Sequence, residues 1–137
     1  MGKRRLARET VLQALYFTDT TTMGADEAFR TAGGGELDED VAAFTRRLLD
    51  GTLEKRAALD ADIQATAENW AIDRMASVDR SILRLAAYEL LHCPDTPVSV
   101  IIDEAIEIAK KYSSEDSSKF INGILGKLKD RRAPAAP

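Results

Sequence analysis

The side chains that most often carry catalysis are sparse in this sequence. His92 and Cys93 are the only residues of their kinds, and they adjoin each other at the end of a helical pattern. Neighbouring side chains of a helix point about 100° apart, so this pair does not place a nucleophile beside its base. The end of a packed helix explains the pair better. One His and one Cys also fall short of the ligand set of a zinc site.

Acidic pairs and glycine runs are the remaining candidates for chemistry. The acidic pairs are Asp38/Asp40 and Glu104/Glu107. Both are expected on solvent faces, where helix-dipole matching and solubility account for them. The run Gly33–Gly35 is not followed by the Lys-Ser/Thr of a phosphate-binding loop. We therefore predict a protein that is not an enzyme and has no catalytic residue, metal or cofactor.

A basic cluster at the start of the chain has a clearer chemical use. Lys3, Arg4, Arg5 and Arg8 fall within eight residues that hold no acid, whereas the remainder has 15 basic and 23 acidic side chains. Helical spacing places Tyr16 two turns beyond Arg8. Single-stranded RNA is bound by neutralising phosphates and stacking bases on aromatic rings. Two interpretations stay open: an RNA site, or a solvated helix start with Tyr16 in the core.

Hydrophobic spacing predicts the helices that must position this cluster, and it shows no strand pattern. The predicted helices cover residues 4–18, 26–31, a segment from Asp38 through Gly51, a segment marked by Leu59, Ile63, Ala67 and Trp70, residues 78–91, a segment from Pro97 with Thr96 as its N-cap, and a last one capped by Ser113 or Ser114. Six or seven helices with mostly short connections predict a compact all-α bundle. We expect one domain over residues 1–130 and a flexible Pro/Ala tail over 131–137.

Residues 78–91 are expected to be the central helix. Apolar residues cover most of its sides, which is typical of a helix that is buried on most sides. Its charged residues lie mostly toward its start, so we expect that end to reach the surface: Asp79, Arg80, Arg84 and Glu89. Earlier in the chain, Gly51 costs up to about 1 kcal/mol relative to Ala in a helix. It predicts a close approach of another helix or a bend.

Composition excludes a membrane-spanning chain. Apolar residues make up 45% of the 137, but no run is long enough to span a bilayer. The first residues lack the apolar run of a signal peptide. A single cysteine allows no internal disulfide, which agrees with a reducing compartment. We expect a cytoplasmic protein.

Several stretches, taken in order, resemble the NusB family of bacterial transcription antitermination factors. They are RRLARE at 4–9 with LQALY at 12–16, DRSILRLAAYEL at 79–90, EAIEIAK at 104–110 after Pro97, and EDSSKFINGIL at 115–125. Each is weak alone, but the ordered combination is specific. The resemblance implies two three-helix subdomains. It also implies binding of boxA-type RNA with NusE, a small-subunit ribosomal protein, in a complex with RNA polymerase that reads through terminators, chiefly on ribosomal RNA operons.

The resemblance also implies site residues. The basic motif would hold RNA phosphates through Lys3, Arg4, Arg5 and Arg8. Residues that match positions near the RNA and NusE surfaces are Tyr16 and Asp116 for either partner, Asp79 for NusE, and Phe120 with its neighbour Lys119 for RNA. The resemblance does not divide these residues firmly between the partners. Phe120 also belongs to a predicted apolar stripe, so a core position for it stays open.

Two other functions stay open. Some relatives form homodimers that hide the RNA surface, so this chain is alternatively a homodimeric interaction module without an RNA role. A NusB-like domain also occurs in some ribosomal RNA cytosine methyltransferases. These 137 residues leave no room for a methyl-donor site, so in that case the chain is a detached domain. Titration of boxA-type RNA with and without NusE separates the three functions.

Overall fold

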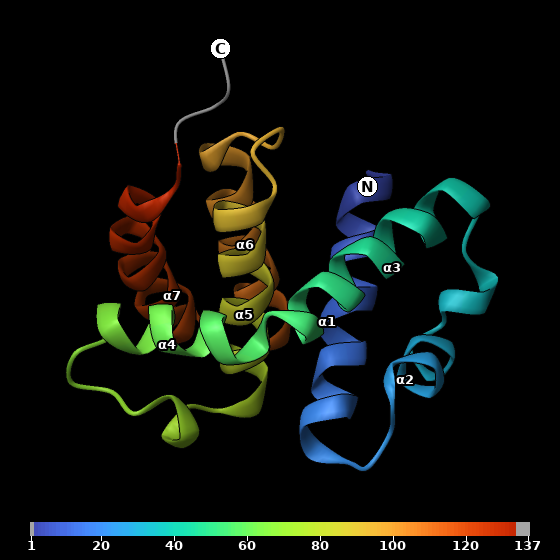
Figure 1. Ribbon diagram of the computed structural model, residues 1–137, viewed down its shortest axis with the longest axis horizontal. Coiled ribbons are helices and arrows are strands. Elements are labelled where there is room, and N and C mark those ends of the chain that lie inside the picture. The colour runs from blue at the N-terminus through green and yellow to red at the C-terminus, as the bar shows by residue number, and fades with distance from the viewer. Residues whose placement is uncertain (1, 134–137) are drawn as a thin grey trace.

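The computed structural model describes residues 2–133, and within them it contains helices and no strand (Figure 1). The α-helices are α1 (Lys3–Thr20), α2 (Ala25–Thr31), α3 (Glu39–Glu54), α4 (Arg56–Thr66), α5 (Ser77–His92), α6 (Val98–Tyr112) and α7 (Glu115–Leu128). Short 3-10 turns lie at Gly34–Glu36, Ile72–Arg74 and Lys129–Arg131. The predicted all-α bundle is confirmed. Among the described residues, no helix has both the length and the apolar character needed to cross a membrane.

The helices form two groups that lie side by side (Figure 1). The first consists of α1, α2 and α3. The second consists of α5, α6 and α7, with α4 packed across α5 and α7. Helix α5 contacts α1 and α3 of the first group and all the helices of its own. Residues 81–90 of α5 are buried without interruption. The two predicted subdomains and the central position of α5 are therefore confirmed.

Gly51 allows α3 to approach α5 closely. The helix continues through this residue, so it marks no break. A Cβ atom added at Gly51 would overlap the ring and the hydroxyl oxygen of Tyr88 on α5. The close approach of another helix, one of the two explanations offered by the sequence, is confirmed.

Charged residues of α5 join it to its neighbours. Arg80 and Arg84 donate hydrogen bonds to Asp19 near the end of α1, with Nη2–Oδ2 at 2.6 Å and Nη1–Oδ1 at 3.2 Å. Arg84 also donates to Asp60 of α4, with Nε–Oδ1 at 2.7 Å. Burial raises the pKa of Asp19, but the hydrogen bonds from the two arginines lower it further, and the net pKa is below the usual value. These contacts tie the two helix groups together.

The expectation that charge brings the start of α5 to the surface is wrong. Asp79, Arg84 and Glu89 are all buried, and Arg80 is half-buried. A buried charge is tolerated where a partner compensates it. The side-chain hydroxyl of Ser117 donates to Asp79 at 2.9 Å, and the other charges meet side chains of opposite sign.

Helix ends differ from the predictions in two places. Helix α4 ends before Trp70, whose side chain is 59% exposed, so the expected helical position of Trp70 is wrong. Pro97 is the N-cap of α6, so the expected cap at Thr96 is one residue early. The cap of α7 is confirmed at Ser114, whose hydroxyl accepts from the Ser117 backbone N–H at 3.0 Å.

The glycine run forms a compact turn between α2 and α3. Gly33 has a φ of 95°, a conformation that L side chains rarely adopt. Gly34 is buried under the Phe29 ring, where a Cβ atom would overlap the ring carbons. Both positions therefore require glycine.

Packing continues beyond residue 130. Arg131 pairs with Asp62 of α4 at 2.9 Å. Arg132 donates to the backbone carbonyls of Cys93 at 2.9 Å and Thr96 at 2.6 Å. The folded domain thus includes these two arginines, which the sequence places in the tail. Residues 134–137 of the predicted tail lie outside the described residues.

Candidate nucleic-acid interface

The predicted site residues separate into two groups at the two ends of α1. The arginine end lies beside the start of α6 and contains Lys3, Arg4, Arg5 and Arg8. The aromatic end lies where α5 and α7 begin and contains Tyr16, Asp79, Asp116, Lys119 and Phe120. A helix of 18 residues such as α1 is about 27 Å long. A ligand that touches both ends must therefore be extended.

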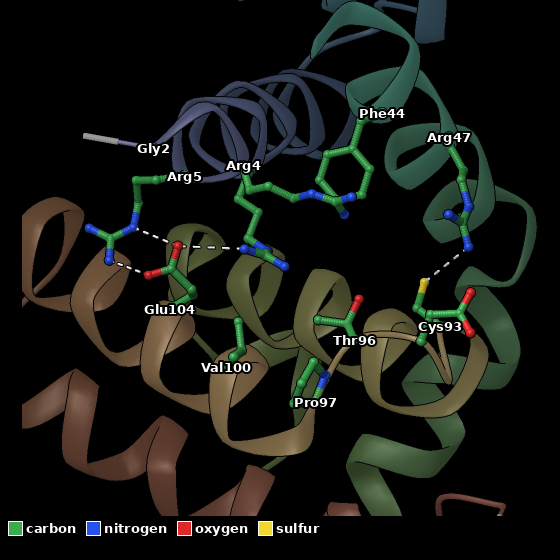
Figure 2. A pocket seen from close by; sticks show the side chains of 12 residues that line it. Gly2, Arg4, Arg5, Phe44, Arg47, Cys93, Thr96, Pro97, Val100 and Glu104 are labelled. Atoms are coloured by element: carbon green, nitrogen blue, oxygen red, sulfur yellow. Dashed lines mark hydrogen bonds and ion pairs between the residues drawn. The ribbon is translucent and has the colours of Figure 1, made fainter. Parts of the chain in front are cut away.

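A hollow of about 630 Å³ opens at the arginine end (Figure 2). Helix α1 contributes Arg4, Arg5 and Arg8 to its lining, and its N-cap Gly2 also lies there. The facing sides come from α3, with Phe44 and Arg47, and from the α5–α6 connection and α6, with Cys93, Asp95, Thr96, Pro97, Val100 and Glu104. The hollow thus lies between the two helix groups, and a ligand in it would contact both.

Arg5 and Arg8 are held by carboxylates of the protein itself. Arg8 is 3% exposed and donates to Glu89 through Nε at 2.9 Å and Nη2 at 2.8 Å. Arg5 makes a two-point contact with Glu104, with Nε–Oε1 at 2.9 Å (Figure 2). Nη1 of Arg8 reaches the same Glu104 oxygen at 3.5 Å. Glu104 therefore faces the arginines, and its expected position on a solvent face is wrong.

This arrangement has an electrostatic consequence for Glu104. The hydrogen bond from Arg5, with the charges of Arg5 and Arg8, lowers the pKa of the carboxyl below its usual value. Arg8 and Glu89 are buried together, and breaking such a pair leaves an uncompensated charge inside the protein. The pair ties α1 to α5 and leaves only 3% of Arg8 exposed.

The exposed charge at this end is carried by Lys3 and Arg4. The Arg4 guanidinium carbon lies 4.0 Å from the centre of the Phe44 ring, which is a cation–π distance (Figure 2). Lys3 lies 3.4 Å from Asp40, and both side chains are well exposed, so this ion pair is weak. Both cations can exchange these contacts for a phosphate.

Arg47 belongs to the same hollow, although the sequence did not single it out. Its side chain is exposed, and Nη2 lies 3.9 Å from the Cys93 sulfur (Figure 2). Phe44 and Arg47 are three residues apart on α3, so they share a face. That spacing is visible in the sequence, but nothing there places this face against the first turn of α1.

His92 and Cys93 do not act on each other. The His92 ring packs against the Tyr88 ring, with centroids 5.4 Å apart. Burial raises the pKa of the Cys93 thiol, which keeps it protonated and poorly nucleophilic. Within residues 2–133, no group of three or more His, Cys, Asp or Glu side chains could hold a metal ion.

The aromatic end offers an apolar groove. Tyr16 is 38% exposed and lines a groove of about 210 Å³. The other lining residues are Leu12, Gln13, Phe17, Val78 and Tyr112. Nearby, Asp79 is buried, and its Oδ1 accepts no hydrogen bond from the described residues. Asp116 is exposed in the first turn of α7.

Phe120 has one side in the core and one side on the surface. It is half-buried and packs against the core cluster. Its ring also meets Trp70 edge to face, with centroids 5.5 Å apart. Both residues line a hollow of about 330 Å³ together with exposed Lys119. Phe120 is therefore partly a core residue, and the rest of its ring is accessible from the hollow.

Known proteins match this chain over nearly its whole length. The model of the NusB family matches residues 5–130. The transcription antitermination protein NusB of Elusimicrobium minutum is 52% identical over 135 residues, which are 96% of each chain.

Solved structures agree with the sequence match. NusB of T. maritima superposes with a TM-score of 0.88 at 37% identity, covering 98% of this chain and 94% of the other. A chain in the crystal structure of antitermination factors NusB and NusE in complex with dsRNA has a TM-score of 0.86 at 25% identity, covering 93% of this chain and 96% of that one. Sequence, fold and the paired arrangement of helix groups together show that this chain belongs to the NusB family.

Proposed function

We propose that this protein is a transcription antitermination factor that binds boxA-type RNA together with NusE. In this proposal it joins RNA polymerase and promotes read-through of terminators, chiefly on ribosomal RNA operons. The hollow at the arginine end carries the proposal, because it gathers exposed guanidinium groups around an aromatic ring. The name of the Elusimicrobium minutum relative and the fold of the NusB–NusE–dsRNA complex support it.

RNA phosphates are proposed to bind at the arginine end through Lys3, Arg4 and Arg5. Arg4 is exposed beside the Phe44 ring. Arg5 is bound to Glu104, and it would replace part of this contact with a contact to a phosphate. Three such contacts on a single strand give a slope of log K against log salt of roughly −2. Arg8 acts indirectly, by fixing the first turns of α1 against α5.

NusE is proposed to bind at the aromatic end. The groove beside Tyr16 offers apolar surface, and Asp79 and Asp116 offer negative charge to a basic partner. Asp79 is buried and accepts a hydrogen bond from Ser117, so its charge would act on the partner from below the surface. Lys119 and Phe120 lie next to this surface and are assigned to RNA.

The test is an anisotropy titration of labelled boxA-type RNA with and without NusE. NusE is expected to tighten binding, and Arg4→Glu is expected to weaken it and make the salt slope shallower. Arg30→Glu is the matched control, because Arg30 is exposed on α2 and lines no part of the hollow. Binding that is unchanged in Arg4→Glu, or equally weakened in Arg30→Glu, contradicts the arginine site.

The same preparation tests the alternatives. A homodimer that stays intact in sedimentation and ignores RNA favours the interaction module. The chain covers 96% of the Elusimicrobium minutum protein, which supports an antitermination factor over a domain of a larger methyltransferase. Location in the cytoplasm is part of the proposal, since transcription takes place there.

A further inference from the structure

Trp70 is the only tryptophan of the chain, and it stands largely in solvent. At 59% exposure it is the most exposed large hydrophobic side chain among the described residues. It lies in the connection between α4 and α5, outside both helices. Tryptophan carries a large apolar surface and is enriched at binding interfaces, so a ring this exposed is a candidate for a binding role.

The backbone around Trp70 is held in place by one side chain. Gln64 of α4 donates to the carbonyl oxygens of Trp70 at 2.7 Å and Ala67 at 3.3 Å. The Gln64 carbonyl oxygen accepts from the Ile72 backbone N–H at 2.8 Å. Trp70 is therefore presented from a fixed connection, and little ordering is needed before it binds.

Positive charge surrounds the indole ring. The hollow of about 330 Å³ that Trp70 shares with Phe120 is also lined by Lys119 and Lys127 of α7. Both lysines are exposed, and neither enters an ion pair within residues 2–133. On its other side, Trp70 lines a second hollow of about 450 Å³ with Arg74. Glu68 is the only acidic residue that lines either hollow.

The surface of α7 below the ring is flat. Lys119, Gly123 and Lys127 follow one another at four-residue spacing, so they share one face of the helix. A Cβ atom at Gly123 would meet no other atom within 4 Å, which means that open space lies above this residue. A planar group can therefore lie against the helix between the two ammonium groups.

We propose that Trp70 and Phe120 form a stacking site for an unpaired RNA base, with Lys119 and Lys127 placed to hold the adjoining phosphates. An aromatic ring flanked by cations is the combination that binds single strands, because every base has a π-face and every linkage a negative charge. The inference rests on the proposed RNA function and extends it to the α4–α5 connection and to Lys127.

The first experiment uses Trp70 as its own reporter. Because the chain has no other tryptophan, its intrinsic fluorescence comes from this ring alone. Titration with boxA-type RNA is expected to quench this fluorescence along the same curve as the anisotropy of the labelled RNA. RNA binding by anisotropy without a change in tryptophan fluorescence overturns the inference and leaves the proposed function intact.

The second experiment uses variants. Trp70→Ala is expected to weaken RNA binding about fivefold to 100-fold, whereas Trp70→Phe keeps a ring and most of the affinity. Lys127→Glu is expected to weaken binding, and Lys129→Glu, an exposed residue just after α7 that lines neither hollow, is its matched control. Thermal melting of each variant confirms that it is folded. If Trp70→Ala does not fold, the comparison of Lys127→Glu with Lys129→Glu tests the inference.

Besides the fluorescence result, three outcomes overturn the inference. RNA affinity that is unchanged in Trp70→Ala and Lys127→Glu removes the stacking site alone. Unchanged RNA affinity with weakened NusE binding assigns this surface to a protein. Wild-type protein that binds no boxA-type RNA at all removes the proposed function, and the stacking site with it, so the two failures are distinguishable.

Discussion

The arginine end and the aromatic end of α1 differ in where their charged groups are directed. At the arginine end, Arg8 is buried against Glu89, and Arg5 is held by Glu104. At the aromatic end, exposed Lys119 lines a hollow with Phe120 and Trp70, and exposed Lys127 lines the same hollow from the far end of α7. A basic motif in a sequence thus combines residues that hold the fold with residues that are free to bind. Arg4 and Arg8 share one face of α1, so the difference comes from their position along the helix: Arg8 lies deep between α1 and α5, and Arg4 lies in the exposed first turn.

Arg8→Ala gives the largest effect and tests the structural half of the motif. Removing it leaves Glu89 as a buried, unpaired charge, so the free energy of unfolding should fall by about 3–5 kcal/mol. Urea denaturation measures the loss. Arg4→Ala, an exposed residue one turn away, should change stability little. If Arg8→Ala leaves stability unchanged and weakens RNA binding instead, the comparison between the two ends fails.

Phe120→Ala should have an intermediate effect that appears in two measurements. The ring is half-buried, so we expect a stability loss of about 1–3 kcal/mol, below the roughly 3–5 kcal/mol of a fully buried Phe. RNA binding should weaken as well. Thermal melting beside an RNA titration separates the two contributions. A loss of stability alone would make Phe120 a core residue and leave Trp70 without its companion in RNA binding.

Glu104→Gln gives the smallest effect and depends on pH. The pKa of Glu104 is lowered in the folded protein, so its ion pairs stabilise the fold above the usual value of 4.5 and this contribution disappears as pH falls below 4.5. The Arg5 and Glu104 side chains are 24% and 19% exposed, and we expect their ion pair to contribute about 1 kcal/mol at neutral pH. Denaturation at several pH values should show wild type and variant converging in acid.

The RNA affinity of Glu104→Gln tests whether Glu104 competes with phosphate for Arg5. Glu104→Gln frees Arg5 from its carboxylate, so RNA affinity at neutral pH should rise by up to about fivefold, which corresponds to roughly 1 kcal/mol. Weaker RNA binding in Glu104→Gln would mean that Glu104 positions Arg5 for the phosphate rather than competing with it.

Local patterns were enough to predict the helices. Apolar spacing, the Ser114 cap and the apolar character of residues 78–91 all depend on neighbours within a few positions, and the structure has the corresponding helices. Trp70 continues the apolar spacing of α4, yet the helix ends earlier because Gln64 binds the carbonyls of Ala67 and Trp70. A hydrogen bond from a side chain to the nearby backbone is hard to predict from the spacing of apolar residues.

The pairing of the arginines could not be predicted, because it depends on how distant helices meet. Glu104 lies at the edge of the apolar stripe of α6, and only the packing of α6 beside α1 brings it to Arg5. Arg47 reaches the hollow for the same kind of reason, through α3. Residue type named the candidates, and tertiary packing decided which of them remain accessible.

The bonds that join Asp19 to Arg80 and Arg84 have a consequence for avidity. They hold α1 against α5, so the arginine end and the stacking rings keep a constant separation. For one strand bound at one end, attachment at the other becomes an intramolecular step, with an effective concentration set by the length between the two contacts. An oligonucleotide too short to reach across gains nothing from the second site. If RNA binds at both proposed sites, the fixed separation between them sets the minimum length of RNA that can reach both.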